Sequence, residues 1–229
     1  MTTTTHPSCS LDNTPVKNTL DRLHTAATKD WRVFARAMPS VVAGYLRGRT
    51  AEQSVIPWLK DAYIPVDASQ GRVLYQLARA SGARRIVEFG TSFGISLIYL
   101  AAAVRDNGGG LVTGTELEPH KRSAALANAQ AAGVGDCVEV LEGDARETLA
   151  GVEGPIDLLL LDGWKDACLP VLKLLQPKLR KSAMVLCDDV KPFRKTLAGY
   201  VDYVRAPGNG FVSFELPLGD GLEFSVLVG

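Results

Sequence analysis

The strongest constraint on the fold is an alternation of short apolar runs with helical segments in the second half of the sequence. The runs are residues 85–89, 111–115, 138–141, 156–161 and 184–187, and the segments between them are 95–105, 119–132, 145–150 and 169–179. Strands that alternate with helices in this way form a parallel sheet with helices on both faces. We therefore predict an α/β, Rossmann-like, doubly wound domain.

The two ends of the chain show different patterns. Apolar runs at 211–216 and 222–228 flank the turn sequence Pro-Leu-Gly-Asp-Gly at 217–221, which is typical of a hairpin. We therefore predict a mostly parallel seven-stranded sheet with a C-terminal antiparallel hairpin. Ahead of the sheet, apolar spacing predicts extra N-terminal helices over 16–63 and a further helix over 72–80.

The first 16 residues are rich in Thr, Ser, Pro and Asn. This composition buries too little surface to hold one conformation. We predict a disordered tail over 1–16 and a single domain over 17–229. Within that domain we expect the N-terminal helices at about 17–63 and the sheet-containing core at about 64–229.

Composition narrows the function classes. The 25 basic and 25 acidic residues give a net charge of +0, so no global field attracts a nucleic acid or an anionic membrane. The four Cys and three His residues are scattered, which argues against zinc and a disulfide framework. The N-terminus lacks a secretory pattern, and the longest apolar stretch, 95–104, is too short to span lipid. We expect a cytoplasmic protein with no nucleic-acid or membrane partner.

Residues 86–96 have the pattern of a strand, a glycine turn and a helix start, where doubly wound sheets bind nucleotides. Gly90 and Gly94 lack the G-x-G-x-x-G spacing of dinucleotide sites, and Glu88 precedes them. A carboxylate is unfavourable beside a pyrophosphate and favourable beside a cationic ligand that carries an amino acid. The pattern E-x-G-x-x-x-G therefore predicts S-adenosylmethionine, although a tight turn alone also explains the two glycines.

The next two strand ends carry acids that suit the rest of this ligand. Glu116, about 26 residues beyond Gly90, is placed to accept both ribose hydroxyls, and Asp144 to accept the adenine amino group. A purely structural role is an alternative to ligand binding at both positions. Glu116 or Glu118 would be favourable charge near a helix N-terminus, and Asp144 is a suitable N-cap.

Two later strands are followed by acids that point to a metal. Asp162 follows the fourth apolar run, and Asp188 and Asp189 follow the fifth. If these strands are adjacent, three carboxylates meet at one edge of the sheet. Hard oxygen ligands with room left for water or substrate suit Mg²⁺. Helix capping is the alternative role for Asp189 and for Asp166.

Lys165 follows Asp162 by three residues and is expected to lie beside the cation. Mg²⁺ and a sulfonium would both disfavour the protonated amine, which predicts a general base. The alternative is an ordinary solvated lysine. Trp164, between Gly163 and Lys165, is expected to form a wall for a flat ligand rather than part of the core.

These residues resemble those of the cation-dependent O-methyltransferases, the family of catechol O-methyltransferase and caffeoyl-CoA O-methyltransferase. The similarity runs from about residue 64 to the C-terminus, and it is most specific over 161–166 and 186–190. The resemblance implies a class I S-adenosylmethionine-dependent enzyme with Lys165 as catalytic base. The implied metal ligands are Asp162, Asp188 and Asp189. The predicted cofactor-binding residues are Val66, Glu88, Gly90, Ser92, Ser96, Glu116, Leu117, Asp144, Ala145, Asp162 and Trp164.

Several positions depart from the family pattern. Asp189 stands where the family often has Asn, Gly163 where the catechol enzyme has His, and Gln70 where that enzyme has Lys. The hairpin turn at 216–221 is more similar to that of the caffeoyl-CoA and bacterial branches. These departures leave the acceptor open.

The resemblance implies that Mg²⁺ binds vicinal hydroxyls of an aromatic ring, that Lys165 removes a proton, and that the phenolate attacks the methyl group. The implied partner is a small phenolic, catechol-like acceptor. The N-terminal helices either cover the pocket or pair in a homodimer. The alternatives are a metal-independent small-molecule methyltransferase, a non-catalytic S-adenosylmethionine-binding module, and a nicotinamide-dependent oxidoreductase, which the missing glycine disfavours.

Overall fold

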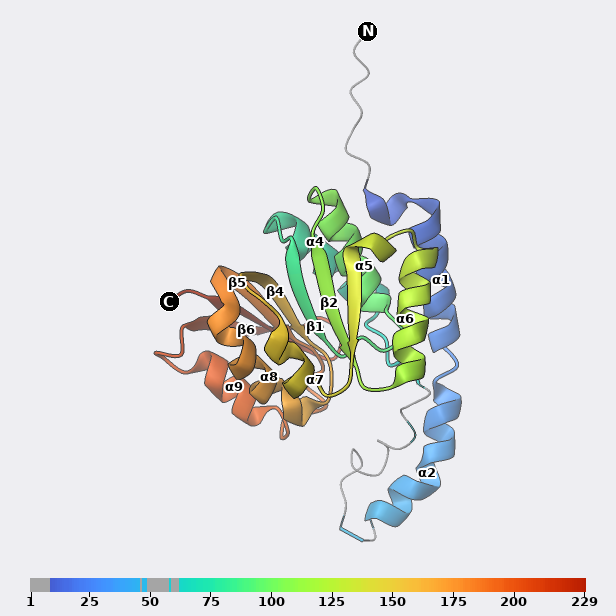
Figure 1. Ribbon diagram of the computed structural model, residues 1–229. Helices are drawn as coiled ribbons and strands as arrows, with labels where there is room; N and C mark the ends of the chain where they lie inside the picture. Colours follow the sequence, from blue (N-terminus) through green and yellow to red (C-terminus); the bar gives the residue numbers. More distant parts are fainter. Residues whose placement is uncertain (1–8, 46, 49–57, 59–61) are drawn as a thin grey trace.

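The computed structural model describes residues 9–45, 47–48, 58 and 62–229. Its centre is a seven-stranded sheet with the strand order β3-β2-β1-β4-β5-β7-β6 (Figure 1). The strands are β1 (Arg85–Phe89), β2 (Leu111–Glu116), β3 (Val138–Glu142), β4 (Ile156–Leu161), β5 (Leu179–Cys187), β6 (Phe211–Leu216) and β7 (Leu222–Leu227). Strands β1 to β5 are parallel, and β7 pairs antiparallel with both β5 and β6. The predicted fold class is confirmed.

Helices cover both faces of the sheet (Figure 1). One layer holds α1 (Thr14–Ala27), α4 (Ala68–Ala80), α5 (Ile95–Asp106) and α6 (Pro119–Ala131), and the other holds α7 (Ala145–Thr148), α8 (Cys168–Leu175) and α9 (Ala198–Arg205). Helix α2 (Trp31–Tyr45) continues from α1 beyond the sheet in Figure 1. Because the central strands are covered on both sides, they are apolar throughout rather than alternating.

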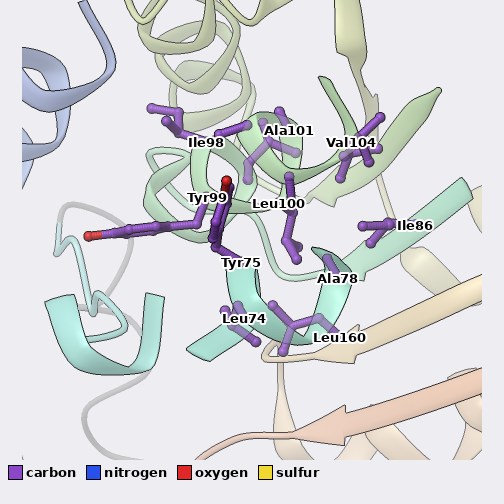
Figure 2. Close-up of a cluster of buried hydrophobic side chains, with 14 of the residues drawn as sticks. Leu74, Tyr75, Ala78, Ile86, Ile98, Tyr99, Leu100, Ala101, Val104 and Leu160 are labelled. Atoms are coloured by element: carbon purple, nitrogen blue, oxygen red, sulfur yellow. The ribbon is translucent and has the colours of Figure 1, made fainter. Parts of the chain in front are cut away.

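The larger of two apolar cores forms where α4 and α5 pack on β1 and β4. Figure 2 shows Tyr75 of α4 beside Tyr99 of α5, and Leu74 of α4 near Leu160 of β4. Helix α5 is buried on all sides from Ile95 to Val104, so its apolar residues show no single face. This packing fixes the N-terminus of α5, and with it the loop that follows β1.

Local sequence sets the starts of the helices that flank the site. Asp67 caps α4, where its side chain accepts from the amides of Ser69 and Gln70 while the Gln70 side chain accepts from the Asp67 amide. This capping box starts the helix at Ala68, earlier than the predicted residue 72. Pro119 occupies the first turn of α6, where its missing N–H costs no hydrogen bond.

The ordered structure begins earlier than the predicted tail allows. Residues 1–8 lie outside the described part of the chain, but Ser10–Asp12 form a 3-10 helix and α1 starts at Thr14. The backbone amide and hydroxyl of Ser10 both donate to Asp106 at the end of α5. These bonds hold a segment whose composition alone predicted disorder. The helical pattern predicted near 55–62 lies almost entirely outside the described residues.

In the C-terminal part of the chain, several predicted helix and strand bounds differ from those in the structure. Helix α8 ends at Leu175 rather than at the predicted residue 179, because Pro177 cannot continue an α-helix. Strand β5 starts at Leu179, earlier than the predicted residue 184. Neither capping alternative holds: α8 starts at Cys168 without a side-chain cap from Asp166, and turns follow Asp189 instead of a helix. Helix α9 was not predicted. Among the described residues, no helix combines the length and apolar character needed to cross a membrane.

Candidate active site

A pocket of about 270 Å³ opens at the carboxyl ends of the parallel strands, where ligands bind in open α/β sheets. Four residues singled out in the sequence line it: Val66, Asp162, Asp188 and Asp189. Gln70, noted as a departure from the family, lines it as well. The other lining residues are Ile64, Pro65, Asp67, Gly219 and Asp220. The segment before α4 and the hairpin loop therefore complete the pocket, a role that strand-end reasoning did not find.

The loop after β1 lies against the loop after β4. Gly90 has a φ of +93°, and a Cβ built on it would lie 2.5 Å from the backbone N and Cα of Gly163. A Cβ on Gly163 would in turn lie 2.4 Å from the Phe89 ring. This close approach explains why glycine, and not the histidine of the catechol enzyme, stands at 163.

We expect Gly90→Ala to lower the free energy of unfolding by about 2–4 kcal/mol, because the methyl group meets backbone that cannot rotate away. Gly133→Ala is the matched control, since Gly133 has a φ of +74° but no atom within 4 Å of its built Cβ. That control should cost about 1 kcal/mol. Urea unfolding of both variants measures the difference, and equal losses would contradict the close approach.

Glu88 is the deepest charged group of the site. Its side chain is fully buried, and Oε2 accepts from the Thr91 hydroxyl at 2.8 Å. Oε1 has no hydrogen-bond partner within the part of the chain that the structure describes. Burial raises the pKa of Glu88 to about 7, against the opposing effect of the Ser96 and Thr91 hydroxyls. A buried carboxylate with one unpaired oxygen suits a ligand that brings a positively charged donor.

This raised pKa makes stability depend on pH. Between the unfolded value near 4.5 and the folded value near 7, the folded state binds the extra proton, so the Glu88 contribution to stability falls as pH rises through that window. We expect Glu88→Gln to stabilise the ligand-free protein at pH 8 by about 1–3 kcal/mol relative to its effect at pH 5. Thermal unfolding at the two pH values tests this expectation. An equal shift at both would contradict it.

Glu116, the predicted ribose ligand, is held by backbone amides. Its Oε2 accepts from the amide of Ser92 at 2.7 Å, and its Oε1 from the amide of Glu118 at 2.9 Å. The carboxylate is therefore fixed at the end of β2 beside the glycine loop. Ser92 takes a positive φ of 46° in that loop, a conformation uncommon for a residue other than glycine.

Asp144 serves the structural role that the sequence left open. It is the N-cap of α7, accepting from the Arg146 amide and pairing with the Arg146 guanidinium. The Arg146 hydrogen bonds lower the pKa of Asp144 to about 2. Its contact with adenine stays a prediction, as do those of Ala145, Leu117 and Trp164. None of these four lines the pocket described above, and Leu117 and Trp164 are exposed.

The ends of β4 and β5 bring acids and an amine together. Lys165 Nζ lies 3.1 Å from Asp162 Oδ1 and 3.0 Å from Asp189 Oδ2, and its side chain is buried. Asp189 has a φ of +62°. The Asp188 carboxylate accepts from the Gln70 side chain and the Asp189 amide, both at 2.9 Å. The adjacency of β4 and β5 on which the predicted cluster depended is confirmed.

Burial dominates the electrostatics of this cluster. It raises the pKa of Asp188 to about 8, and like-charged Asp162 and Asp189 add to the shift. It also raises the pKa of Asp162, to about 6, against the opposing effect of Lys165. Burial alone would lower the pKa of Lys165, but the carboxylates of Asp162 and Asp189 raise it above its ordinary value. Among the protein's own groups Lys165 is thus held protonated, and the lowering of its pKa expected from a bound cation and sulfonium stays a prediction.

The side chains of Asp162, Asp188 and Asp189 are not arranged in a metal-coordinating geometry. Across residues 9–45, 47–48, 58 and 62–229, no group of three or more His, Cys, Asp or Glu side chains is arranged to hold a metal ion. Lys165 instead lies between Asp162 and Asp189. The pocket nevertheless holds more carboxylate than ammonium charge, which favours an added cation.

Comparisons with known proteins agree with this geometry. A methyltransferase-domain family matches residues 87–190, from the strand before the glycine loop to the acids after β5. Catechol O-methyltransferase of Mycobacterium tuberculosis is 38% identical over 128 residues, which cover 56% of this chain and 57% of that relative. Caffeoyl-CoA O-methyltransferase 2 of Zea mays is 28% identical over 190 residues, covering 72% of this chain and 70% of the relative.

A solved structure extends the similarity to three dimensions. The O-methyltransferase TomG from Streptomyces achromogenes, in complex with S-adenosylmethionine, superposes with a TM-score of 0.59 at 26% identity, covering 72% of this chain and 82% of that one. In sequence and in fold the chain is similar to class I S-adenosylmethionine-dependent O-methyltransferases. Its match to the mycobacterial relative spans little more than half of that relative's length.

Proposed function

We propose that this protein transfers the methyl group of S-adenosylmethionine to one hydroxyl of a catechol-like or other small phenolic acceptor, with the help of Mg²⁺ or another divalent cation. The observation that carries the proposal is the meeting of Asp162, Asp188 and Asp189 in one pocket, with buried Lys165 paired to two of these acids. The names of the relatives support the phenolic class of acceptor.

The residues of the glycine loop fit S-adenosylmethionine. The unpaired Oε1 of Glu88 offers a buried acceptor for the amino group of the methionine part. Glu116 keeps lone pairs for the ribose hydroxyls while two amides hold its orientation. Gly90 lets the backbone approach the ligand without a side chain in the way.

The acidic cluster fits a divalent cation by charge and donor type. Asp162, Asp188 and Asp189 would hold the ion through carboxylate oxygens, the ligands that Mg²⁺ prefers. Bound there, the cation would lower the pKa of an acceptor hydroxyl and reduce the carboxylate charge that holds the proton on Lys165. Gln70 keeps Asp188 oriented, since its side chain donates to one oxygen and leaves the other for the pocket.

The protein's own groups then carry out three tasks. Lys165 accepts the hydroxyl proton at Nζ, a general-base step. The glycine loop and Glu116 hold the donor while the pocket wall orients the acceptor, so that attack on the methyl carbon is nearly in line. The hairpin loop at Gly219, which lies against Gln70, helps to exclude water.

The experiment that tests this function is a methyl-transfer assay with purified protein. A panel of catechols, hydroxycinnamoyl thioesters and polyphenols, each with and without Mg²⁺, should yield a mono-methylated product only with the cation. A metal-independent methyltransferase is the second candidate, because Lys165 already bridges Asp162 and Asp189 without an ion. Full activity after treatment with EDTA would favour that candidate, and no transfer to any acceptor would contradict both.

A further inference from the structure

Residues 62–67, the wall segment, connect the N-terminal region to α4. Four of these residues line the pocket: Ile64, Pro65, Val66 and Asp67. A segment without helix or strand structure therefore forms one side of the proposed active site. Its position must be fixed by contacts from other parts of the chain.

One set of contacts joins the wall segment to the cofactor loop. The Ser92 hydroxyl donates to the Tyr63 carbonyl at 2.9 Å, and the Tyr63 ring stacks on Phe93 with centroids 4.1 Å apart and planes 22° apart. The buried Lys121 of α6 donates to the Ala62 carbonyl at 2.8 Å. Because Ser92 also donates its amide to Glu116, a shift of the wall segment would disturb the proposed ribose site.

A second set of contacts joins the wall segment to the acidic cluster. Val66 is buried in the core, and Asp67 forms the capping box with Gln70. The Gln70 side chain then donates to Asp188 at 2.9 Å. The wall segment thus lies between the two halves of the site and contacts both.

A carboxylate outside the pocket also holds the wall segment. Asp30, in the turn between α1 and α2, accepts from the amide of Tyr63 at 3.1 Å and from the amide of Ile64 at 2.9 Å, one bond to each oxygen. Ile64 has a φ of +43°, which is strained for a β-branched side chain. Such strain persists only where the surroundings hold the backbone in place.

We propose that Asp30 is a positioning residue of the active site, whose carboxylate sets the wall segment against the cofactor loop. It does not line the pocket and acts through Tyr63 and Ile64. This inference rests on the proposed function. It assigns a role in positioning the site to the corner between α1 and α2, outside the residues 87–190 that match the methyltransferase-domain family.

Asp30→Asn tests the inference, because an amide has one acceptor oxygen and leaves one of the two N–H groups unpaired. By calorimetry, the Kd for S-adenosylhomocysteine should rise about tenfold, which corresponds to about 1.4 kcal/mol. The KM for both substrates should rise more than kcat falls. By mass spectrometry, hydrogen exchange of the peptide covering 62–67 should accelerate, while the strands of the sheet keep their protection.

Two further variants complete the experiment. Asp30→Glu keeps both acceptor oxygens and should recover part of the affinity. Asp21→Asn, an exposed position of α1, removes the same charge and should leave both affinity and exchange unchanged. Wild-type affinity and exchange in Asp30→Asn would overturn the inference, and so would faster exchange throughout the protein with a matching loss of Tm. If the wild type binds no S-adenosylhomocysteine, the proposed function fails, and exchange over 62–67 still decides the role of Asp30.

Discussion

Replacement of Lys165 by arginine is expected to lower kcat by about 10²–10⁴-fold, the usual contribution of a general base. Arginine keeps the positive charge between Asp162 and Asp189 but does not give up its proton at any working pH. The fold and the binding of S-adenosylhomocysteine should therefore survive, with Kd within about threefold of wild type. Single-turnover methyl transfer with saturating substrates and cation measures the loss.

Two companion variants make this result decisive. Lys165→Met removes the charge as well, so it should lose the same activity and also about 1–3 kcal/mol of stability, because two partly buried carboxylates lose their partner. Lys173→Met, on the exposed side of α8, serves as the control and should keep full activity. A Lys165→Arg enzyme with near wild-type kcat would remove Lys165 from the chemistry.

Loss of the divalent cation is the second change with a large expected effect. Dialysis against EDTA should lower kcat by about 10²-fold or more, since a hydroxyl without a Lewis acid keeps its ordinary pKa and Lys165 stays protonated. Added Mg²⁺ should restore the rate. Asp162→Asn should raise the Mg²⁺ concentration needed for half-maximal rate by at least about tenfold to a hundredfold, because it removes one anionic ligand.

The control for this experiment lies in the same loop. Asp166→Asn also removes a carboxylate, four residues further on, but Asp166 is exposed and does not line the pocket. Its Mg²⁺ requirement should match that of the wild type. Equal shifts in Asp162→Asn and Asp166→Asn would mean that general charge attracts the ion and that no defined site holds it.

The sequence predicted those parts of the fold that depend on local patterns. The buried strands β1 and β4 were found with their full bounds, because both faces of each strand are covered and the apolar runs are continuous. Helix α9 was not predicted because it is short and buries only Tyr200 and Val204 within its bounds. Such a pattern is too weak to separate a helix from a loop.

The candidate site was predictable to the extent that strand ends determine it. The three acids Asp162, Asp188 and Asp189 meet because β4 and β5 are neighbours in the sheet. Strands that follow one another in the sequence are usually adjacent, so the sequence favoured this pairing. The contacts of Asp30 with Tyr63 and Ile64 span more than 30 positions and follow no periodicity. The direction of the Lys165 shift also depends on two distances that no sequence pattern supplies.

The most direct test of the central claim is a crystal structure of the protein with Mn²⁺ and S-adenosylhomocysteine, examined by anomalous scattering. Mn²⁺ takes the same oxygen ligands as Mg²⁺ and scatters strongly enough to be located. The expected result is one anomalous peak bounded by carboxylate oxygens of Asp162, Asp188 and Asp189, next to Lys165. A peak elsewhere, or density for the ligand with no peak at these three residues, would contradict the account.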